Sequence, residues 1–319
     1  MGGTSKKAVT ANEVIADAVI QAVTANGIDP DGIAKAVNDA AVKYINTNKV
    51  MLSEAIIEVA RKEISMPRVI EVTVPDGGTK PAVAHKQFDE LAKVVASGVP
   101  ALMVGMPGTG KTTAAEQIAD QFKLPFESIS VGIQTTKSDI LGFVDAGGTY
   151  QTTGFRRAFE DGGVFLMDEV DAGNPNVLIV INSAISNGFC NFPDGMIKAH
   201  KDFKFIATAN TFGTGADTKF IGRNQLDEAT LDRFITINWE IDEFVEDSLV
   251  DNKDWLTKVR KLRKDAAKKG RELLVSPRVS IYGNQLIKAG FNMRQAADMT
   301  ILKGKDGDTK KYITDVMGV

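Results

Sequence analysis

Residues 105–112 read Gly-Met-Pro-Gly-Thr-Gly-Lys-Thr, or GMPGTGKT. The stretch fits the phosphate-loop pattern in full, with an apolar strand candidate before it and a helix-forming stretch, residues 113–120, behind it. Glycines there let backbone N–H groups close on phosphate oxygens, and the helix N-terminus adds partial positive charge. We expect Lys111 to reach the β- and γ-phosphates and the Thr112 hydroxyl to ligate Mg²⁺. The predicted nucleotide-binding residues are Gly105, Pro107, Gly108, Thr109, Gly110, Lys111, Thr112 and Thr113.

Outward from this loop, helical and strand-like segments alternate, which predicts an α/β fold with a mainly parallel sheet. Beyond residue 241 the pattern is helical to the end, and Ser276 followed by Pro277 suits a helix start. We predict a small all-α N-terminal domain at 1–65, a strand and linker at 66–83, an α/β nucleotide-binding core at 84–242 and a helical lid at 243–319. The five strand candidates of the core are Ala101–Gly105, Phe126–Ser130, Val164–Asp168, Phe203–Thr208 and Phe234–Asn238.

The composition is that of an ordinary folded protein. The 319 residues are 43% hydrophobic and 25% charged, which argues against wholesale disorder. A formal charge of −3 gives the whole chain no strong attraction for nucleic acid or anionic membranes. Apolar runs are far shorter than the roughly 18 to 20 residues that span a bilayer. A lone cysteine, Cys190, and a start without an apolar signal-like stretch lead us to expect a reducing cytoplasm.

Two consecutive carboxylates, Asp168 and Glu169, follow the apolar run at 164–167. Open α/β sheets bind ligands at the carboxyl ends of their strands, so both side chains are expected beside the phosphate loop. We assign Asp168 to magnesium, through its water shell, and Glu169 to orienting or deprotonating the water that attacks the γ-phosphate. A solvated turn is the usual reading of such a pair alone, but the phosphate loop upstream favours catalysis.

Asn210 closes the next strand candidate, where its amide is placed to hold the attacking water or touch the γ-phosphate. A helix or turn cap is the competing reading. Arg233 precedes the fifth strand candidate. An arginine there is able to complete a neighbouring subunit's site, and such an arginine finger contributes roughly three to five decades in rate. Taken alone, an arginine there is more often a surface charge.

Four motifs in this order resemble the AAA+ ATPases of the MoxR type, and in particular the CobS-like cobaltochelatase ATPases, including stand-alone versions carried by bacteriophages. The motifs are GMPGTGKT at 105–112, VFLMDEVDAGNPNV at 164–177, ATANTFGTGAD at 207–217 and GRNQLDEATLDRF at 222–234. The resemblance covers residues 84–242, half of the chain.

The resemblance implies an AAA+ P-loop NTPase core with a parallel five-stranded sheet, and a ring, commonly a hexamer, with ATP and Mg²⁺ between subunits. It implies that Arg233 acts in trans, whereas the cis residues are Lys111, Thr112, Asp168, Glu169 and Asn210. It also implies that Arg278, which opens a lid helix after Ser276 and Pro277, contacts the γ-phosphate.

Two stretches match insertions of the family, Phe143–Phe155 and Gly188–His200, which line the upper face or pore of the ring in related ATPases. Tyr150 and Phe192 are the apolar tips we single out for partner contact, and local packing within each hairpin is the alternative. Arg223, Arg156 and Arg157 are further candidates for trans contacts, ranked below Arg233. His85 and His200 are expected on the surface or at a helix start, and Cys190 as an inert packing residue.

The leading functional hypothesis is an ATP-hydrolysing ring that remodels or activates a partner protein. The MoxR resemblance suggests a partner with a von Willebrand A domain. We expect the chain to act in the cytoplasm, and in the cytoplasm of the host if a phage encodes it. A nucleic-acid motor or loader for phage replication or packaging is the alternative, and the basic run Lys258–Arg271 favours it. A metal-chelatase subunit ranks third, because nothing in the sequence supplies metal-ligand clusters or a tetrapyrrole site.

Overall fold

The structure is a computed structural model, and it describes residues 37, 39, 69–73, 79–213, 215 and 222–319. The chain divides into two units, Met1–Pro67 and Arg68–Val319, and the sheet, the site and the lid all lie in the second. The helical domain predicted for residues 1–65 falls outside the described residues, apart from two helical positions, Val37 and Asp39. Residues 66–68 and 74–78 of the predicted strand and linker also lie outside them.

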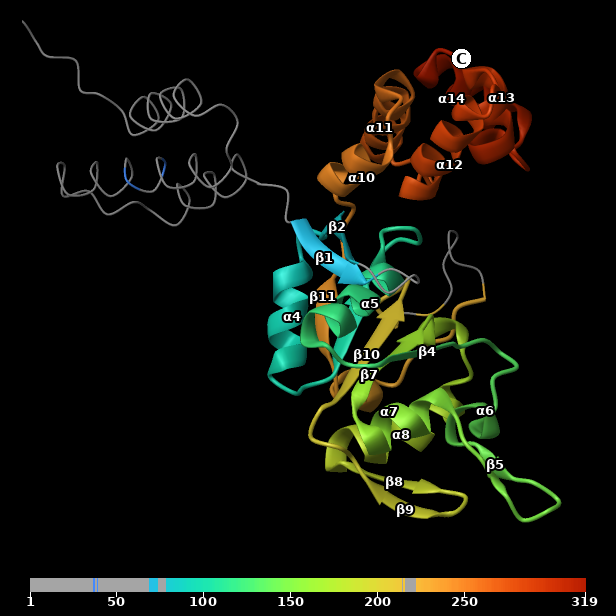
Figure 1. The fold of residues 1–319 in the computed structure, drawn as a ribbon. Coiled ribbons are helices and arrows are strands. Elements are labelled where there is room, and N and C mark those ends of the chain that lie inside the picture. Colours follow the sequence, from blue (N-terminus) through green and yellow to red (C-terminus); the bar gives the residue numbers. More distant parts are fainter. Residues whose placement is uncertain (1–36, 38, 40–68, 74–78, 214, 216–221) are drawn as a thin grey trace, which may run out of the picture. The chain divides into compact units, whose positions relative to one another are not determined.

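A five-stranded sheet forms the centre of the second unit, as predicted (Figure 1). Its strand order is β11-β3-β10-β7-β4, and every neighbouring pair is parallel. Each observed strand lies within two residues of its predicted bounds. The strands are β3 (Ala101–Val104), β4 (Phe126–Ser130), β7 (Gly163–Asp168), β10 (Phe203–Ala209) and β11 (Ile235–Asn238).

Helices cover both faces of this sheet, because successive side chains of a buried strand point to opposite sides. Ala101 and Met103 pack in one apolar cluster, while Leu102 and Val104 pack in the other. The first cluster includes α4 (Phe88–Ala96) and α5 (Lys111–Phe122). The second includes α6 (Lys137–Leu141), α7 (Gly154–Asp161) and α8 (Pro175–Asn187). Strands buried on both faces explain the nearly continuous apolar runs of the sequence.

Within the part of the chain that the structure describes, three antiparallel strand pairs accompany the sheet. The predicted insertion at 143–155 contains one, and the hairpin predicted at 188–200 is another. A short 3-10 turn, η1 (Val170–Ala172), follows β7, and α9 (Glu228–Leu231) precedes β11. The hairpins are β1 (Val69–Thr73) with β2 (Thr79–Val83), β5 (Phe143–Val144) with β6 (Tyr150–Gln151), and β8 (Phe189–Phe192) with β9 (Gly195–Lys198).

Two side chains expected at exposed loop tips pack inward instead. Phe192 is only 5% exposed and lies 5.9 Å from Phe155 between ring centroids. The half-buried Tyr150 donates its hydroxyl proton to the Leu141 carbonyl over 2.6 Å. The expectation for Phe192 is wrong because alternation along β8 turns Cys190 and Phe192 inward and leaves Phe189 outside. Cys190 is buried, and burial raises the pKa of its thiol to about 11.

The helical lid follows the sheet along the chain (Figure 1). It has an apolar core of its own. None of the described helices is long and apolar enough to cross a membrane. The basic run Lys258–Arg271 falls largely on α11, whose other side buries Leu262 and Ala266. The lid elements are α10 (Glu243–Leu249), α11 (Lys253–Lys268), α12 (Pro277–Lys288), α13 (Met293–Ala297), the π-helix η2 (Asp298–Leu302) and α14 (Gly307–Met317).

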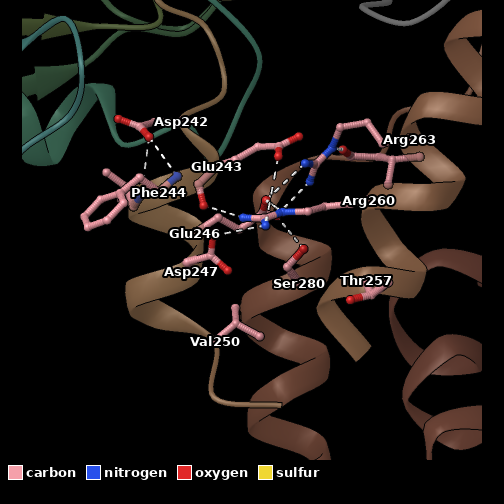
Figure 2. A network of polar contacts seen from close by, with 12 residues as sticks. Asp242, Glu243, Phe244, Glu246, Asp247, Val250, Thr257, Arg260, Arg263 and Ser280 are labelled. Atoms are coloured by element: carbon pink, nitrogen blue, oxygen red, sulfur yellow. Dashed lines mark hydrogen bonds and ion pairs between the residues drawn. The ribbon is translucent and has the colours of Figure 1, made fainter. Parts of the chain in front are cut away.

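A buried carboxylate, Glu246, joins three of these helices (Figure 2). It accepts hydrogen bonds from Arg263 over 2.8 and 3.1 Å, from Arg260 over 3.1 Å, and from the Ser280 hydroxyl over 2.5 Å. Burial alone would raise the pKa of Glu246, but the donations from Arg263, Ser280 and Arg260 outweigh it and hold the pKa below its ordinary value of 4.5. The carboxylate therefore fixes α10 against α11 and α12.

We predict that Glu246→Gln lowers the free energy of unfolding by about 3 kcal/mol, because two guanidinium groups lose their buried counter-charge. Glu243→Gln, on the exposed side of the same helix, is the matched control and should cost less than about 1 kcal/mol. Urea denaturation at pH 7 measures both. Equal losses in the two variants would contradict the role given to Glu246.

The same interaction makes stability depend on pH. A folded-state pKa below the unfolded one contributes stability that is complete above the unfolded-state pKa and disappears as the pH falls through the folded-state value. The difference between the wild type and Glu246→Gln should be full above pH 4.5 and narrow at lower pH, where Glu246 becomes protonated. Denaturation curves over a pH series measure this, and a pH-independent difference would count against it.

Candidate nucleotide site

The phosphate loop runs from the end of β3 into α5 and takes backbone conformations that glycine permits. Gly108 and Gly110 have φ of 79° and 86°, in the left-handed region. The Gly105 N–H donates to the Ala209 carbonyl over 3.1 Å, which ties the start of the loop to β10. A Cβ atom on Gly105 would lie 2.0 Å from the Trp239 carbonyl oxygen, so only glycine fits there.

Lys111, the first residue of α5, turns back toward the loop. Its Nζ donates to the Gly105 carbonyl over 2.6 Å, to the Met106 carbonyl over 3.1 Å and to Asn210 Oδ1 over 3.0 Å. Burial lowers the pKa of Lys111 to about 8, although the nearby carboxylates, chiefly that of Asp168, favour its charged form. The ammonium group is thus held within the loop, where a phosphate would compensate its desolvation.

Thr112 and Asp168 meet at the end of β7, as predicted. The Thr112 hydroxyl donates to Asp168 Oδ2 over 2.8 Å. The other carboxylate oxygen of Asp168 accepts from the hydroxyl of Thr208, a fully buried residue of β10. A hydroxyl and a carboxylate side by side are hard oxygen donors, the kind of ligand that Mg²⁺ takes together with substrate phosphates. These two residues therefore fit a magnesium ion.

Glu169 lies one residue beyond, with φ of 58°, an uncommon value for a residue other than glycine. Its N–H donates to the Thr208 hydroxyl over 3.0 Å, and its side chain is 42% exposed toward the pocket that it lines. Arg223 donates to Glu169 Oε2 over 3.3 Å from both of its terminal nitrogens. The predicted catalytic carboxylate thus lies at the site and carries an arginine partner from its own chain.

Asn210 lies at the end of β10, where its side chain joins Lys111. Its N–H donates to Asp171 Oδ2 over 3.1 Å. The structure thus brings together the predicted cis residues from three adjacent strands, β3, β10 and β7, because parallel strands end at the same edge of the sheet.

The lid supplies the other wall of the site. A cavity of about 400 Å³ lies between the phosphate loop and the lid helices. Arg278, on the first turn of α12, lies so close to the loop that a Cβ atom on Gly108 would be 2.7 Å from its Cγ. Apolar side chains complete the lid side of the cavity and fit a nucleobase, whereas the loop fits its phosphates. They belong to Val245, Leu249, Ile281 and Tyr282.

Of the four candidate trans arginines, only Arg223 contacts a residue that lines this cavity among the contacts described, and the other three pair elsewhere. Arg233 stands just before β11, at the edge of the sheet opposite the phosphate loop, and donates from Nε to the Ser186 hydroxyl over 2.9 Å. Arg156 is wrong as a trans candidate: it is buried and ion-paired with Glu160 and Asp194, over 2.7 Å each. Arg157 is about half exposed and pairs with Glu127 over 2.7 Å.

Three features of the site escaped the sequence analysis. Asp171 is fully buried and bonds the backbone after β10, and its position two residues after Glu169 in Asp-Glu-Val-Asp was the available signal. Thr208 was hidden inside an apolar run. His85, expected at the surface or at a helix start, is 5% exposed, and its ring stacks on Trp239 with centroids 4.2 Å apart.

The stacked rings of His85 and Trp239 support the phosphate loop through a hydrogen bond to its backbone. Trp239 Nε1 donates to the Thr109 carbonyl over 3.2 Å. His85 Nδ1 accepts from the Gln87 N–H over 3.2 Å, so its Nε2 carries the proton and donates to the Glu240 carbonyl over 2.8 Å. Burial lowers the pKa of His85 and so favours this neutral ring, although the hydrogen bond to the Glu240 carbonyl acts in the opposite direction. Neither ring lies among the residues that line the cavity.

Comparison with known proteins agrees with this geometry. Residues 100–234 match the family model described as AAA domain (dynein-related subfamily). The chain is similar to the aerobic cobaltochelatase subunit CobS of Sinorhizobium sp., with 31% identity over 42% of this chain and 43% of that protein. It is also similar to the Lon protease of Metamycoplasma arthritidis (strain 158L3-1), with 34% identity over 36% of this chain and 15% of that protein. The chain thus spans less than half the length of both relatives.

Among solved structures, the chain is similar to NtrX from Brucella abortus in complex with ATP, with 14% identity, a TM-score of 0.41 and coverage of 87% of this chain and 60% of that one. The AAA match and the strand order agree on the AAA+ P-loop fold. Residues 100–234 therefore carry the sequence pattern of an AAA domain, and the site offers residues that fit ATP phosphates and Mg²⁺.

We predict that Trp239→Phe weakens binding of Mg-ATP about fivefold, since losing one hydrogen bond to the phosphate loop removes about 1 kcal/mol. Trp255→Phe is the matched control: its indole is also fully buried and donates to the Ser280 carbonyl over 3.1 Å, inside the lid. Both variants should lose stability, but only Trp239→Phe should lose affinity in titration calorimetry. Unchanged affinity in Trp239→Phe would contradict the supporting role of this ring.

Proposed function

We propose that this chain is a Mg-dependent AAA+ ATPase of the MoxR and CobS-like type that forms a ring, shares its ATP sites between subunits and remodels or activates a partner protein. One observation supports the proposal above the others. The cis residues converge at the carboxyl ends of the strands, while Arg233 lies at the amino end of β11, on the opposite side of the sheet. In this layout Arg233 cannot reach the site of its own chain, and it is able to complete only the site of a neighbouring subunit.

The cis roles follow from chemistry and position. The loop amides and Lys111 bind the β- and γ-phosphates, and Thr112 with Asp168 holds the metal ion. Mg²⁺, when bound, neutralises charge that develops on the phosphate oxygens. Asn210 orients the attacking water, Glu169 takes its proton, and Arg278 offers charge to the γ-phosphate from the lid.

The trans role of Arg233 rests on its distance from its own phosphate loop. Ile235 pairs with Ala101 and Asn238 with Val104. Arg233 precedes β11, so the length of β3 separates it from the phosphate loop. Four strand residues extend about 13 Å, at about 3.3 Å each, before the loop begins. A head-to-tail ring places this edge of one subunit against the open site of the next. The hexamer implied by the sequence resemblance is the form we propose.

The β5–β6 and β8–β9 hairpins are the proposed contacts with a protein client. Because Tyr150 and Phe192 pack inward, the exposed apolar side chains there take their place as candidates for contact. A client with a von Willebrand A domain, in the cytoplasm, is the partner that the MoxR likeness suggests. The exposed residues are Phe143 and Val144 on β5, Phe189 on β8 and Met196 on β9.

The nucleic-acid alternative loses part of its support. Arg260 and Arg263, in the middle of the basic run, are 17% and 16% exposed and pair with Glu246 inside the lid. They are therefore committed to folding rather than to phosphate contacts. The chelatase role comes from the name of the CobS relative alone, and the described residues offer no observation that favours it over protein remodelling.

Glu169→Gln tests the assignment of the general base. We predict a loss of at least about a hundredfold in ATP turnover, because an amide takes up no proton, with the affinity for Mg-ATP unchanged within about twofold. Glu116→Gln, exposed on α5 beside the same loop, is the control and should keep wild-type turnover. Steady-state phosphate release and nucleotide titration measure both quantities. Retained turnover in Glu169→Gln would remove this residue from the mechanism.

A further inference from the structure

Arg223 bridges two carboxylates of its own chain. Its Nη1 lies 3.3 Å from Glu169 Oε2 and 3.1 Å from Asp171 Oδ1, and its Nη2 is also 3.3 Å from Glu169 Oε2. The arginine side chain is 15% exposed and Asp171 is fully buried. A planar guanidinium is suited to this double contact, whereas a lysine ammonium is a single point of charge.

Asp171 is a rigid anchor for this arginine. Its Oδ2 accepts from the N–H groups of Asn210 and Thr211, over 3.1 and 3.0 Å, and from the Thr211 hydroxyl over 3.0 Å. Its Oδ1 faces Arg223. If Arg223 swung outward, a buried carboxylate oxygen would lose its cationic partner, and such a loss is strongly unfavourable.

The backbone beside Arg223 is held to the same loop. The Asn224 N–H donates to the Asp171 carbonyl over 2.7 Å, and Asn224 Nδ2 donates to the Gly173 carbonyl over 2.7 Å. Arg223 is thus fastened through both its side chain and its neighbour. An arginine that reaches into another subunit would have to be free of such contacts.

Glu169, in contrast, is poorly held without this partner. Thr208 fixes its N–H, but the carboxylate lies at the end of a long side chain that is 42% exposed. General-base catalysis requires that carboxylate within hydrogen-bond reach of the water, and a displacement of about 1 Å is able to cost a hundredfold in rate.

We infer that Arg223 is a positioning residue that acts in cis: anchored on Asp171, it holds the Glu169 carboxylate at the place where the attacking water is activated. The inference rests on the proposed function and replaces the trans role considered for Arg223 in the sequence analysis. Asp171 then positions both residues assigned to the attacking water. It accepts a hydrogen bond from the Asn210 N–H and, through Arg223, holds the carboxylate of Glu169.

Arg223→Gln and Arg223→Lys test the positioning role. Both should lower kcat about a hundredfold and leave the Kd of Mg-ATP unchanged within about twofold, since the arginine touches the base and not the phosphate loop. Arg294→Gln, which removes a half-exposed arginine of α13 that does not line the cavity, should keep wild-type turnover. Thermal unfolding identifies a variant that fails to fold, and the lysine variant then decides. Wild-type kcat in a folded Arg223 variant would overturn the inference.

Mixing subunits separates a cis from a trans role. In a head-to-tail ring, Lys111→Ala subunits supply an intact trans side, so an equal mixture with Arg233→Ala should recover up to about a quarter of wild-type turnover. The same mixture with Arg223→Gln should recover nothing, because every site in it has a defective cis side. Recovery there would overturn the inference. If the Arg233→Ala mixture also stays inactive, the shared-site proposal fails, and the kcat of the Arg223 variants alone then decides the inference.

Discussion

The order of the parallel strands is the constraint on which the rest of the structure depends. With β10 between β3 and β7, the phosphate loop, Asn210 and the Asp168–Glu169 pair end at one edge within hydrogen-bond reach. Thr208 makes this explicit, because it contacts both Asp168 and the Glu169 N–H from the neighbouring strand. A parallel sheet collects residues that lie far apart in the sequence, and the remaining features support or close that edge.

Buried charge is the second recurring device. Asp171 in the core and Glu246 in the lid are both almost fully buried, and each is satisfied by arginine and by further donors. Buried pairs of this kind contribute little net stability, but breaking one is costly, so they specify a single arrangement. Glu246 fixes the helix that carries the nucleobase wall, and Asp171 fixes the loop beyond β7. Both carboxylates therefore act on the site from outside its phosphate-contacting residues.

The sequence predicted the sheet well, because strands such as β3 and β7 are buried on both faces and appear as short apolar runs. It also predicted the phosphate loop and the carboxylate pair, whose chemistry is local in sequence. It did not predict where Phe192 points or what Arg156 and Arg223 contact, because these depend on pairings between distant segments. The partners of Arg223 precede it by 52 and 54 residues, a separation that no periodic pattern spans.

If ATP binds between subunits, its binding stabilises their assembly, so the decisive measurement is the solution mass of Glu169→Gln with and without Mg-ATP. This variant should bind nucleotide without consuming it, so any assembly that ATP stabilises will persist during the measurement. We predict a shift to about six copies of the chain when Mg-ATP is added, as expected for a closed ring. A monomer that persists at saturating Mg-ATP would leave Arg233 with no site to complete and would rule out shared ATP sites.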